Sequence, residues 1–135
     1  MCIRDRARAV LGRYYARAKE NELAMQYYSE ALEILSDQAD PGSAVEVAML
    51  LGQVLSDAGR REEAAEHYMD ALLLAEANDF RMLQGELLAR LGEVESDRSQ
   101  KVEYLQRSLT VFRELGAVDR MREVQTSVHR AVMGN

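Results

Sequence analysis

Residues 48–55 read Ala-Met-Leu-Leu-Gly-Gln-Val-Leu and residues 64–72 read Ala-Ala-Glu-His-Tyr-Met-Asp-Ala-Leu, and these two stretches decide the fold. In both, apolar residues recur at three- and four-residue intervals, which is the period of an amphipathic helix. Gly59 lies between them and suits the left-handed residue that ends a helix. The sequence therefore predicts two helices, over about 43–57 and 61–77, joined by a tight turn.

The same pattern recurs along the chain at an interval of 40 residues. Leu-Gly pairs stand at positions 11–12, 51–52 and 91–92. The other positions that repeat at this interval are Ala24 and Ala64, Tyr28 and Tyr68, Ala31 and Ala71, and Leu32 and Leu72. A single shift shared by so many positions predicts a repeat protein built from helical hairpins.

The repeat predicts further helices over 7–19, 23–35, 80–95 and 100–115, and a seventh over 118–133. The second helix of the third unit aligns at a shift of 37 instead of 40, because three residues are missing near 96–99. The seventh helix places apolar residues on one face only, as a capping helix requires. These residues are Met121, Val124, Val128 and Val132.

Local signals mark where two of these helices begin. After the linker 36–42, Ser43 and Glu46 form a Ser-x-x-Glu pattern, which predicts a capping box with Ser43 as the N-cap. Asp79 is the predicted N-cap of the first helix of the third unit.

Three glycines inside predicted helices indicate close packing. A glycine costs about 1 kcal/mol relative to alanine in a helix interior, so a recurring one suggests a packing reason. Gly12, Gly52 and Gly92 would let the two helices of a hairpin approach closely, with the recurring alanines as the small partner and Tyr28 and Tyr68 filling the space around them.

Composition agrees with an all-α chain, because helix-forming residues abound and there is one proline and no tryptophan. The net charge of −6 is uneven, since residues 7–19 carry four basic and no acidic side chains and the body of the chain is acidic. An acidic body argues against nucleic acid as a ligand. No apolar run approaches the roughly 18 residues of a membrane helix.

The first six residues, Met-Cys-Ile-Arg-Asp-Arg, match no helix pattern well and resemble the translated end of a transposon adapter used to prepare sequencing libraries. We therefore expect residues 1–6 to be non-native and the chain to be a metagenomic fragment of a larger bacterial protein. A genuine start codon is the alternative. The only cysteine, Cys2, falls in this segment, so disulfide and thiol chemistry have no support.

Position by position, the units resemble the tetratricopeptide repeat, whose pattern is Trp-x2-Leu-Gly-x2-Tyr followed by Ala-x3-Phe and Ala. The first unit reads Arg8-x2-Leu11-Gly12-x2-Tyr15 and Ala24-x3-Tyr28-x2-Ala31, and the second reads Ala48-x2-Leu51-Gly52-x2-Leu55 and Ala64-x3-Tyr68-x2-Ala71. The third reads Leu88-x2-Leu91-Gly92-x2-Glu95 and, more weakly, Lys101-x3-Leu105-x2-Ser108. The family's usual period is about 34 residues, so this is a lengthened variety. The resemblance implies one α-solenoid domain over 7–133, with repeats at 7–36, 43–77 and 79–115 and a capping helix.

The resemblance also implies a concave groove that is lined by the first helix of each hairpin and holds a protein or peptide. Its positions in this chain are Arg13, Arg17, Met49, Gln53, Ser56, Glu86, Arg90 and Glu93. Arg13 and Arg17 share a helix face, so they would hold a peptide carboxylate or pair with acids of a preceding repeat. Relatives that clamp chaperone C-termini need Lys and Asn at positions that are here Ala9, Arg13, Leu50, Gln53, Glu86 and Arg90, so that clamp is not matched.

Nothing in the sequence forms a catalytic or metal-binding constellation. His67 and His129 lie in different units without partners at metal-ligand spacing, and His67 aligns with Tyr27 on a predicted surface. There is no Gly-x-Ser-x-Gly motif and no phosphate-binding glycine loop. We therefore expect no enzymatic activity and no cofactor.

The leading hypothesis is a cytoplasmic protein- or peptide-binding scaffold module of a larger bacterial regulatory protein. A first alternative is a sensor arm of a multidomain signalling enzyme, such as a kinase, a nucleotide cyclase or a signalling ATPase. A second alternative is self-association to a homo-oligomer through the exposed side of the helix at 7–19. Neither nucleic acid nor a membrane is an expected partner.

Overall fold

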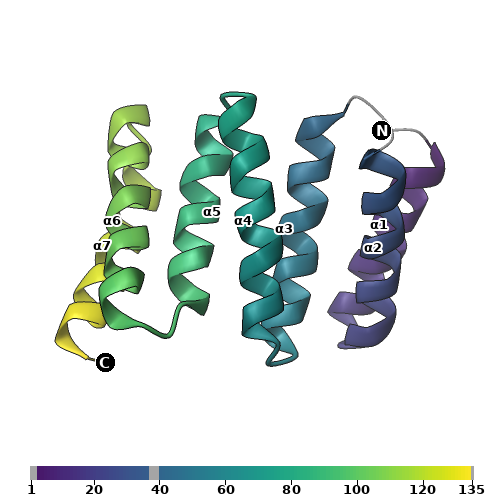
Figure 1. The fold of residues 1–135 in the computed structure, drawn as a ribbon, viewed down its shortest axis with the longest axis horizontal. Coiled ribbons are helices and arrows are strands. Elements are labelled where there is room, and N and C mark those ends of the chain that lie inside the picture. Colours follow the sequence, from purple (N-terminus) through teal and green to yellow (C-terminus); the bar gives the residue numbers. More distant parts are fainter. Residues whose placement is uncertain (1–2, 37–39, 135) are drawn as a thin grey trace.

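The computed structural model describes residues 3–36 and 40–134, and the regular elements in them are all α-helices. They are α1 (Ile3–Arg17), α2 (Asn21–Ser36), α3 (Pro41–Asp57), α4 (Arg61–Ala77), α5 (Arg81–Val94), α6 (Arg98–Leu115) and α7 (Val118–Met133). The helices follow one another across the molecule in chain order (Figure 1). The described residues therefore form the α-solenoid that the sequence predicts.

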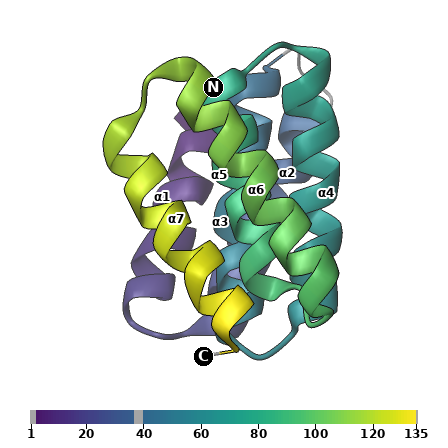
Figure 2. The ribbon, with the colours of Figure 1, turned by 90° about the vertical axis from the view of Figure 1, so that its left-hand side faces the viewer.

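The helices lie in two layers (Figure 2), with α1, α3, α5 and α7 in one and α2, α4 and α6 in the other. Within each hairpin the two helices pack on each other, and each second helix also packs on the first helix of the next hairpin. Because α1 contacts α3 and α3 contacts α5, the first helices form a continuous surface. This layer carries the candidate site.

In the first two hairpins, a glycine of the first helix lies under a buried tyrosine of the second. A Cβ added to Gly12 would stand 2.7 Å from Cδ1 of Tyr28, and one added to Gly52 would stand 2.4 Å from Cε1 of Tyr68. Both tyrosines are fully buried. The predicted close approach is confirmed, but the atoms nearest to these glycines belong to the tyrosine rings rather than to the recurring alanines.

The third hairpin has two such contacts. A Cβ on Gly92 would stand 2.7 Å from Cδ2 of Leu105, which confirms the shift of 37 in this unit. A Cβ on Gly85 would stand 2.7 Å from Cε1 of Phe112, and the sequence analysis missed this contact. No Leu-Gly pair marks Gly85, so the repeat pattern did not single it out.

The beginning of α3 corrects the predicted capping box. The N-cap is Asp40, whose Oδ1 accepts a hydrogen bond from the backbone N–H of Ser43 at 3.2 Å. Pro41 occupies the first turn, where its fixed φ suits a helix and its missing N–H is not needed. Proline therefore starts the helix two residues earlier than predicted, and Ser43 and Glu46 lie inside it.

Asp79 is not an N-cap either, because it has a left-handed backbone with φ of 57° and α5 begins at Arg81. It takes the place of Gly59, φ 82°, in a turn of the same form. In the first turn the backbone N–H of Arg60 donates a hydrogen bond to the carbonyl of Leu55, and in the second the N–H of Phe80 donates to the carbonyl of Ala75. Each bond closes a Schellman-type C-cap. This geometry accounts for the three-residue spacing between helices, which propensity alone does not predict.

The ends of the solenoid differ slightly from the predicted ones. α1 begins at Ile3, so residues 3–6 are helical although they fit no helix pattern well, while Met1 and Cys2 lie outside the described residues. α7 has the predicted bounds and buries Val124, but Val132 is exposed and Ala131 packs in its place. Among the described residues, no helix combines the length and apolar character needed to span a membrane.

Candidate functional site

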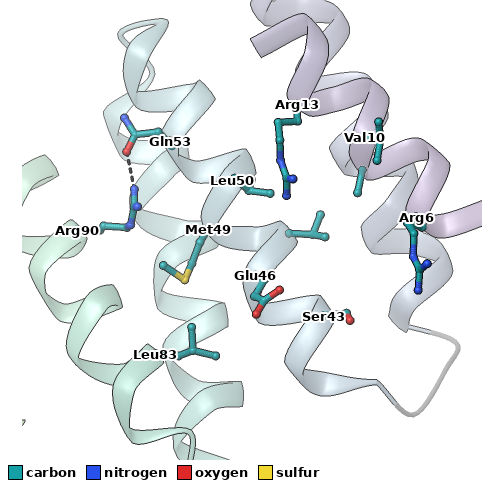
Figure 3. A pocket seen from close by; sticks show the side chains of 12 residues that line it. Arg6, Val10, Arg13, Ser43, Glu46, Met49, Leu50, Gln53, Leu83 and Arg90 are labelled. Atoms are coloured by element: carbon teal, nitrogen blue, oxygen red, sulfur yellow. Dashed lines mark hydrogen bonds between the residues drawn. The ribbon is translucent and has the colours of Figure 1, made fainter. Parts of the chain in front are cut away.

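A groove of about 740 Å³ runs across the first-helix layer, between α1, α3 and α5 (Figure 3). Cavities of roughly 300–1,000 Å³ are typical of ligand sites. The residues that line it are Arg6, Ala9, Val10, Arg13, Ser43, Glu46, Val47, Met49, Leu50, Gln53, Leu83 and Arg90. Three consecutive hairpins therefore contribute to a single surface.

Four of the predicted groove residues meet in this cavity, namely Arg13, Met49, Gln53 and Arg90. The structure does not bring the other four to it. Arg17 and Glu93 are exposed on α1 and α5, and Ser56 is half-buried near the end of α3. Glu86 is engaged with α7.

Glu86 and Arg120 form a two-point ion pair that ties α5 to α7. Arg120 Nε donates to Glu86 Oε1 at 2.6 Å and Nη2 donates to Oε2 at 2.8 Å. The Arg120 guanidinium also lies 5.3 Å from the centre of the Phe112 ring and pairs with Glu123. Hydrogen bonding to Glu86 raises the pKa of Arg120. This contact positions the capping helix and withdraws the Glu86 carboxylate from the groove.

Arg90 is the most constrained cation of the groove. Its Nη1 donates a hydrogen bond of 2.5 Å to Gln53 Oε1, and its Nε is buried with no hydrogen-bond partner among the described residues. Burial raises the pKa of the Tyr68 phenol, and a hydrogen bond from Arg90 opposes that rise. No carboxylate of the described residues forms an ion pair with Arg90. The guanidinium is therefore fixed at the groove by Gln53, and no described carboxylate neutralises its charge.

The charge of the groove is opposite to that of the chain. Arg6, Arg13 and Arg90 line it against the single carboxylate of Glu46, whereas the whole chain carries −6. Figure 3 shows Arg6 and Arg13 projecting from α1 and Arg90 from α5, on either side of the α3 residues. A basic groove with low-dielectric walls on an acidic protein attracts anionic groups.

Two thirds of the lining residues were not predicted, although the repeat contains a signal for several of them. Moving Arg90 back by one and two periods of 40 gives Leu50 and Val10, and moving Glu86 back gives Glu46 and Arg6. If each predicted groove position had been transferred to the equivalent residue of every hairpin, these lining residues would have been predicted. Leu83 and Ser43 are also one period apart.

Neither histidine belongs to this groove. His129 is exposed on α7, while His67 is half-buried, so its predicted surface position is only partly correct. His67 borders a second cavity of about 620 Å³, which is mainly apolar and lies between α2, α3 and α4. Within residues 3–36 and 40–134, no three His, Cys, Asp or Glu side chains gather as metal ligands would.

These features define a class of protein, the α-solenoid of helical hairpins with a groove along its first-helix layer. Residues 5–37 and 45–78 each match the family model of the tetratricopeptide repeat. The chain belongs to the tetratricopeptide repeat family, in a variety with a lengthened period. The third hairpin, which departs from the family pattern, lies outside the matched residues.

Comparison with solved structures confirms the fold. The apo form of RapI matches with a TM-score of 0.88 at 15% identity, over 94% of this chain and 47% of that one. The TPR2AB domain of yeast Sti1, in a complex with pHSP90, matches with a TM-score of 0.72 at 19% identity. The match covers 94% of this chain and 48% of that one. A signal transduction ATPase with a tetratricopeptide repeat sensor, from Pyrococcus horikoshii, matches with a TM-score of 0.75 at 18% identity. The match covers 90% of this chain and 20% of that one.

The chain spans less than half the length of each of these structures. At these identities the likeness concerns the fold alone. A search of curated protein sequences gives no match.

Proposed function

We propose that the chain is a protein-interaction module that binds an acidic peptide segment in the groove between α1, α3 and α5, without catalysis of its own. The observation that carries the proposal is Arg90, a guanidinium that lines the groove, is held by Gln53 and forms no ion pair with a described carboxylate. Arg13 supplies further positive charge along the same groove. The yeast Sti1 domain, which shares the fold, is described in a complex with pHSP90, and this supports a peptide as the ligand class.

The chemistry of the groove indicates how such a peptide would be held. A carboxylate of the ligand accepts hydrogen bonds from Arg90, whose charge-assisted bonds are about twice as strong as neutral ones. Val10, Leu50 and Leu83 line the same groove and offer apolar surface for a neighbouring side chain of the ligand. An aliphatic or aromatic residue close to an acidic one is therefore the expected motif.

A peptide-display selection against the whole chain tests this proposal. We expect enrichment of sequences that place Asp, Glu or the C-terminal carboxylate beside an apolar residue. Arg90→Gln and Arg13→Gln should each weaken the binding of a selected peptide by about 10- to 100-fold, because a hydrogen bond to a charged group contributes roughly 1.5–3 kcal/mol and each tenfold change in affinity is about 1.4 kcal/mol.

Arg122→Gln is the matched control, because Arg122 is exposed on α7 and does not line the groove. It should leave the affinity unchanged. Selection of no peptide, or of peptides whose affinity survives both groove substitutions, would contradict the proposal.

The TPR-sensor ATPase that shares the fold supports a second candidate, in which the same module is the sensor arm of a larger signalling enzyme. The binding chemistry of the groove is the same in both cases. Joining the module to the signalling domain of its parent protein and measuring activity with and without the selected peptide would distinguish them, because a scaffold leaves that activity unchanged.

A further inference from the structure

An apolar stripe on α1 is exposed, although two of its three register positions are buried in the second and third hairpins. The stripe consists of Val10, Leu11 and Tyr14, which are exposed by 56%, 39% and 65%. Their spacing of one, three and four residues places them on one side of the helix. Leu23, at the beginning of α2, is another large exposed apolar residue near that end of the solenoid. This α1 stripe needs a physical explanation, because exposed apolar residues in a group mark interaction sites.

The repeat shows what covers such a surface. Leu11 and Tyr14 recur one and two periods later as Leu51, Val54, Leu91 and Val94, all of which are buried. In those hairpins the second helix of the preceding hairpin packs on the first helix, as α2 does on α3 and α4 does on α5. α6 packs on α7 in the same way. The described structure therefore contains three examples of the interface that the α1 stripe would form with a helix.

Charge narrows the kind of helix that fits. Arg13 and Arg17 are exposed next to the stripe, and neither forms an ion pair with a described carboxylate. Two of the three covering helices are acidic, since residues 21–36 hold three acids and no base and residues 61–77 hold five acids and one arginine, whereas residues 98–115 hold four bases and two acids. A second copy pairing α1 against α1 would bring like charges together, which disfavours a symmetric dimer.

We propose that the α1 stripe docks an acidic amphipathic helix of a partner polypeptide, seated on α1 as α2 is seated on α3. Apolar residues of that helix cover Leu11 and Tyr14, and its carboxylates meet Arg13 and Arg17. This surface adjoins the groove, because Val10 and Arg13 border both, but it does not include Arg90.

A synthetic peptide of residues 61–77, carrying a fluorophore and neutral ends, is the probe, because α4 already covers α5 in this manner. We expect its anisotropy to rise on titration with the full chain, with a dissociation constant in the range of roughly 10–1,000 µM because an isolated helix of this length is marginal. Leu11→Glu with Tyr14→Glu should weaken binding by about tenfold or more, since it removes apolar contact and adds like charge.

Leu73→Glu, at an exposed apolar position of α4, is the matched control and should bind as the wild type does. Arg90→Gln should also bind normally, which separates this surface from the groove. Arg17→Glu provides a milder variant at an exposed position, and it should weaken binding and reduce its dependence on salt. Circular dichroism checks that every variant is folded.

Absence of binding at millimolar peptide would overturn the proposal, as would binding that survives the double substitution. Sedimentation supplies the remaining outcome. A dimer of the chain that Leu11→Glu with Tyr14→Glu abolishes would show that a second copy covers the stripe, and the proposal of an acidic partner helix would then be wrong. A monomer at all concentrations agrees with it.

Discussion

The second and third hairpins have the same backbone plan but close on different side chains. α3 and α4 approach at one glycine, where the ring of Tyr68 lies over Gly52. α5 and α6 approach at two, where Phe112 lies over Gly85 and Leu105 over Gly92. The hairpin geometry is therefore compatible with more than one distribution of side-chain volume along the contact.

The register positions of Gly85 and Phe112 in the second hairpin are Val45 and Ala75, and both are fully buried. In the third hairpin the small Gly85 of α5 faces the large Phe112 of α6. In the second hairpin the same positions hold the medium-sized Val45 and the small Ala75. Such volume exchange keeps a core filled while residue identities change. The family pattern is defined by residue types at fixed positions, and the third hairpin has other residue types at several of those positions. This explains why the third hairpin lies outside the match.

Polar contacts also distinguish the two hairpins. In the third, Ser108 Oγ donates to the backbone carbonyl of Gly85 at 2.7 Å and Lys101 Nζ donates to that of Gly92 at 2.6 Å. At the same register the second hairpin has Ala71 and Ala64, which are buried alanines. Burial lowers the pKa of Lys101, because the ammonium group is partly removed from water.

Among the substitutions that test this comparison, truncation of Phe112 should have the largest effect on the free energy of unfolding. Phe112→Ala removes a fully buried ring above Gly85 and should lower the free energy of unfolding by about 3–5 kcal/mol. Urea denaturation followed by far-UV circular dichroism measures it. Adding Gly85→Val recreates the Val45 and Ala75 pair of the second hairpin, so the double variant should be more stable than the single one. A double variant that is less stable would contradict the volume-exchange argument.

Adding a methyl group should separate the two kinds of glycine contact. Gly52→Ala places a Cβ 2.4 Å from the buried ring of Tyr68, and the net cost should be about 1–3 kcal/mol after the helix-propensity gain. Gly92→Ala meets Cδ2 and Cγ of Leu105 at 2.7 and 2.8 Å, and an aliphatic side chain can change rotamer more easily than a buried ring, so its net cost should be smaller, at about 0–1 kcal/mol. Thermal and urea unfolding of both variants measure the difference, and equal effects would remove the distinction between ring and aliphatic partners.

Removal of the buried hydroxyl should have a moderate effect confined to the third hairpin. Ser108→Ala recreates the residue of the second hairpin, Ala71, and deletes the bond to the Gly85 carbonyl. A loss of about 0.5–1.5 kcal/mol is expected for one intramolecular hydrogen bond. Ser99→Ala, at an exposed position of the same helix, should change the unfolding free energy little. If Ser108→Ala did not lower the free energy of unfolding, alanine at this position would be as stable as serine in the third hairpin, and the expected contribution of the hydrogen bond would be wrong.

The smallest expected effect concerns the turns. Gly59 serves the turn within the second hairpin, and Asp79 serves the turn before the third, where its left-handed backbone is strained for a residue with a Cβ. Asp79→Gly should raise the free energy of unfolding by a few tenths up to about 1 kcal/mol. Gly59→Ala should lower it by a similar amount, and a melting-temperature comparison of the two variants would show opposite signs. A destabilised Asp79→Gly would contradict this account of the turn.

Much of the fold could be read from the chain because it repeats. The Leu-Gly pairs and the recurring Tyr28 and Tyr68 predicted hairpins that close at the glycines, and the structure confirms this. Helix beginnings were harder, since Ser43 and Asp79 both suit an N-cap by residue type. Pro41 decided the first outcome, because the helix already starts there, and the turn that ends α4 decided the second, because Asp79 forms part of that turn.

The candidate site could be predicted only in part. Arg13, Met49, Gln53 and Arg90 line one cavity, because helix periodicity determines which residues share a face. Whether a side chain on that face stays available depends on neighbours far along the chain. Glu86 shows this, since Arg120 lies 34 residues away and takes both of its carboxylate oxygens.

The sequence by itself determined the number and order of the helices, their pairing into hairpins and the positions where backbones must come close. These properties follow from local periodicity and from the absence of a Cβ. Only the tertiary structure decided which cations have partners and which surfaces are covered, because those depend on contacts between residues far apart in the sequence. Arg90 with its unpaired nitrogen, Glu86 bound to α7 and the exposed stripe on α1 all belong to this second group.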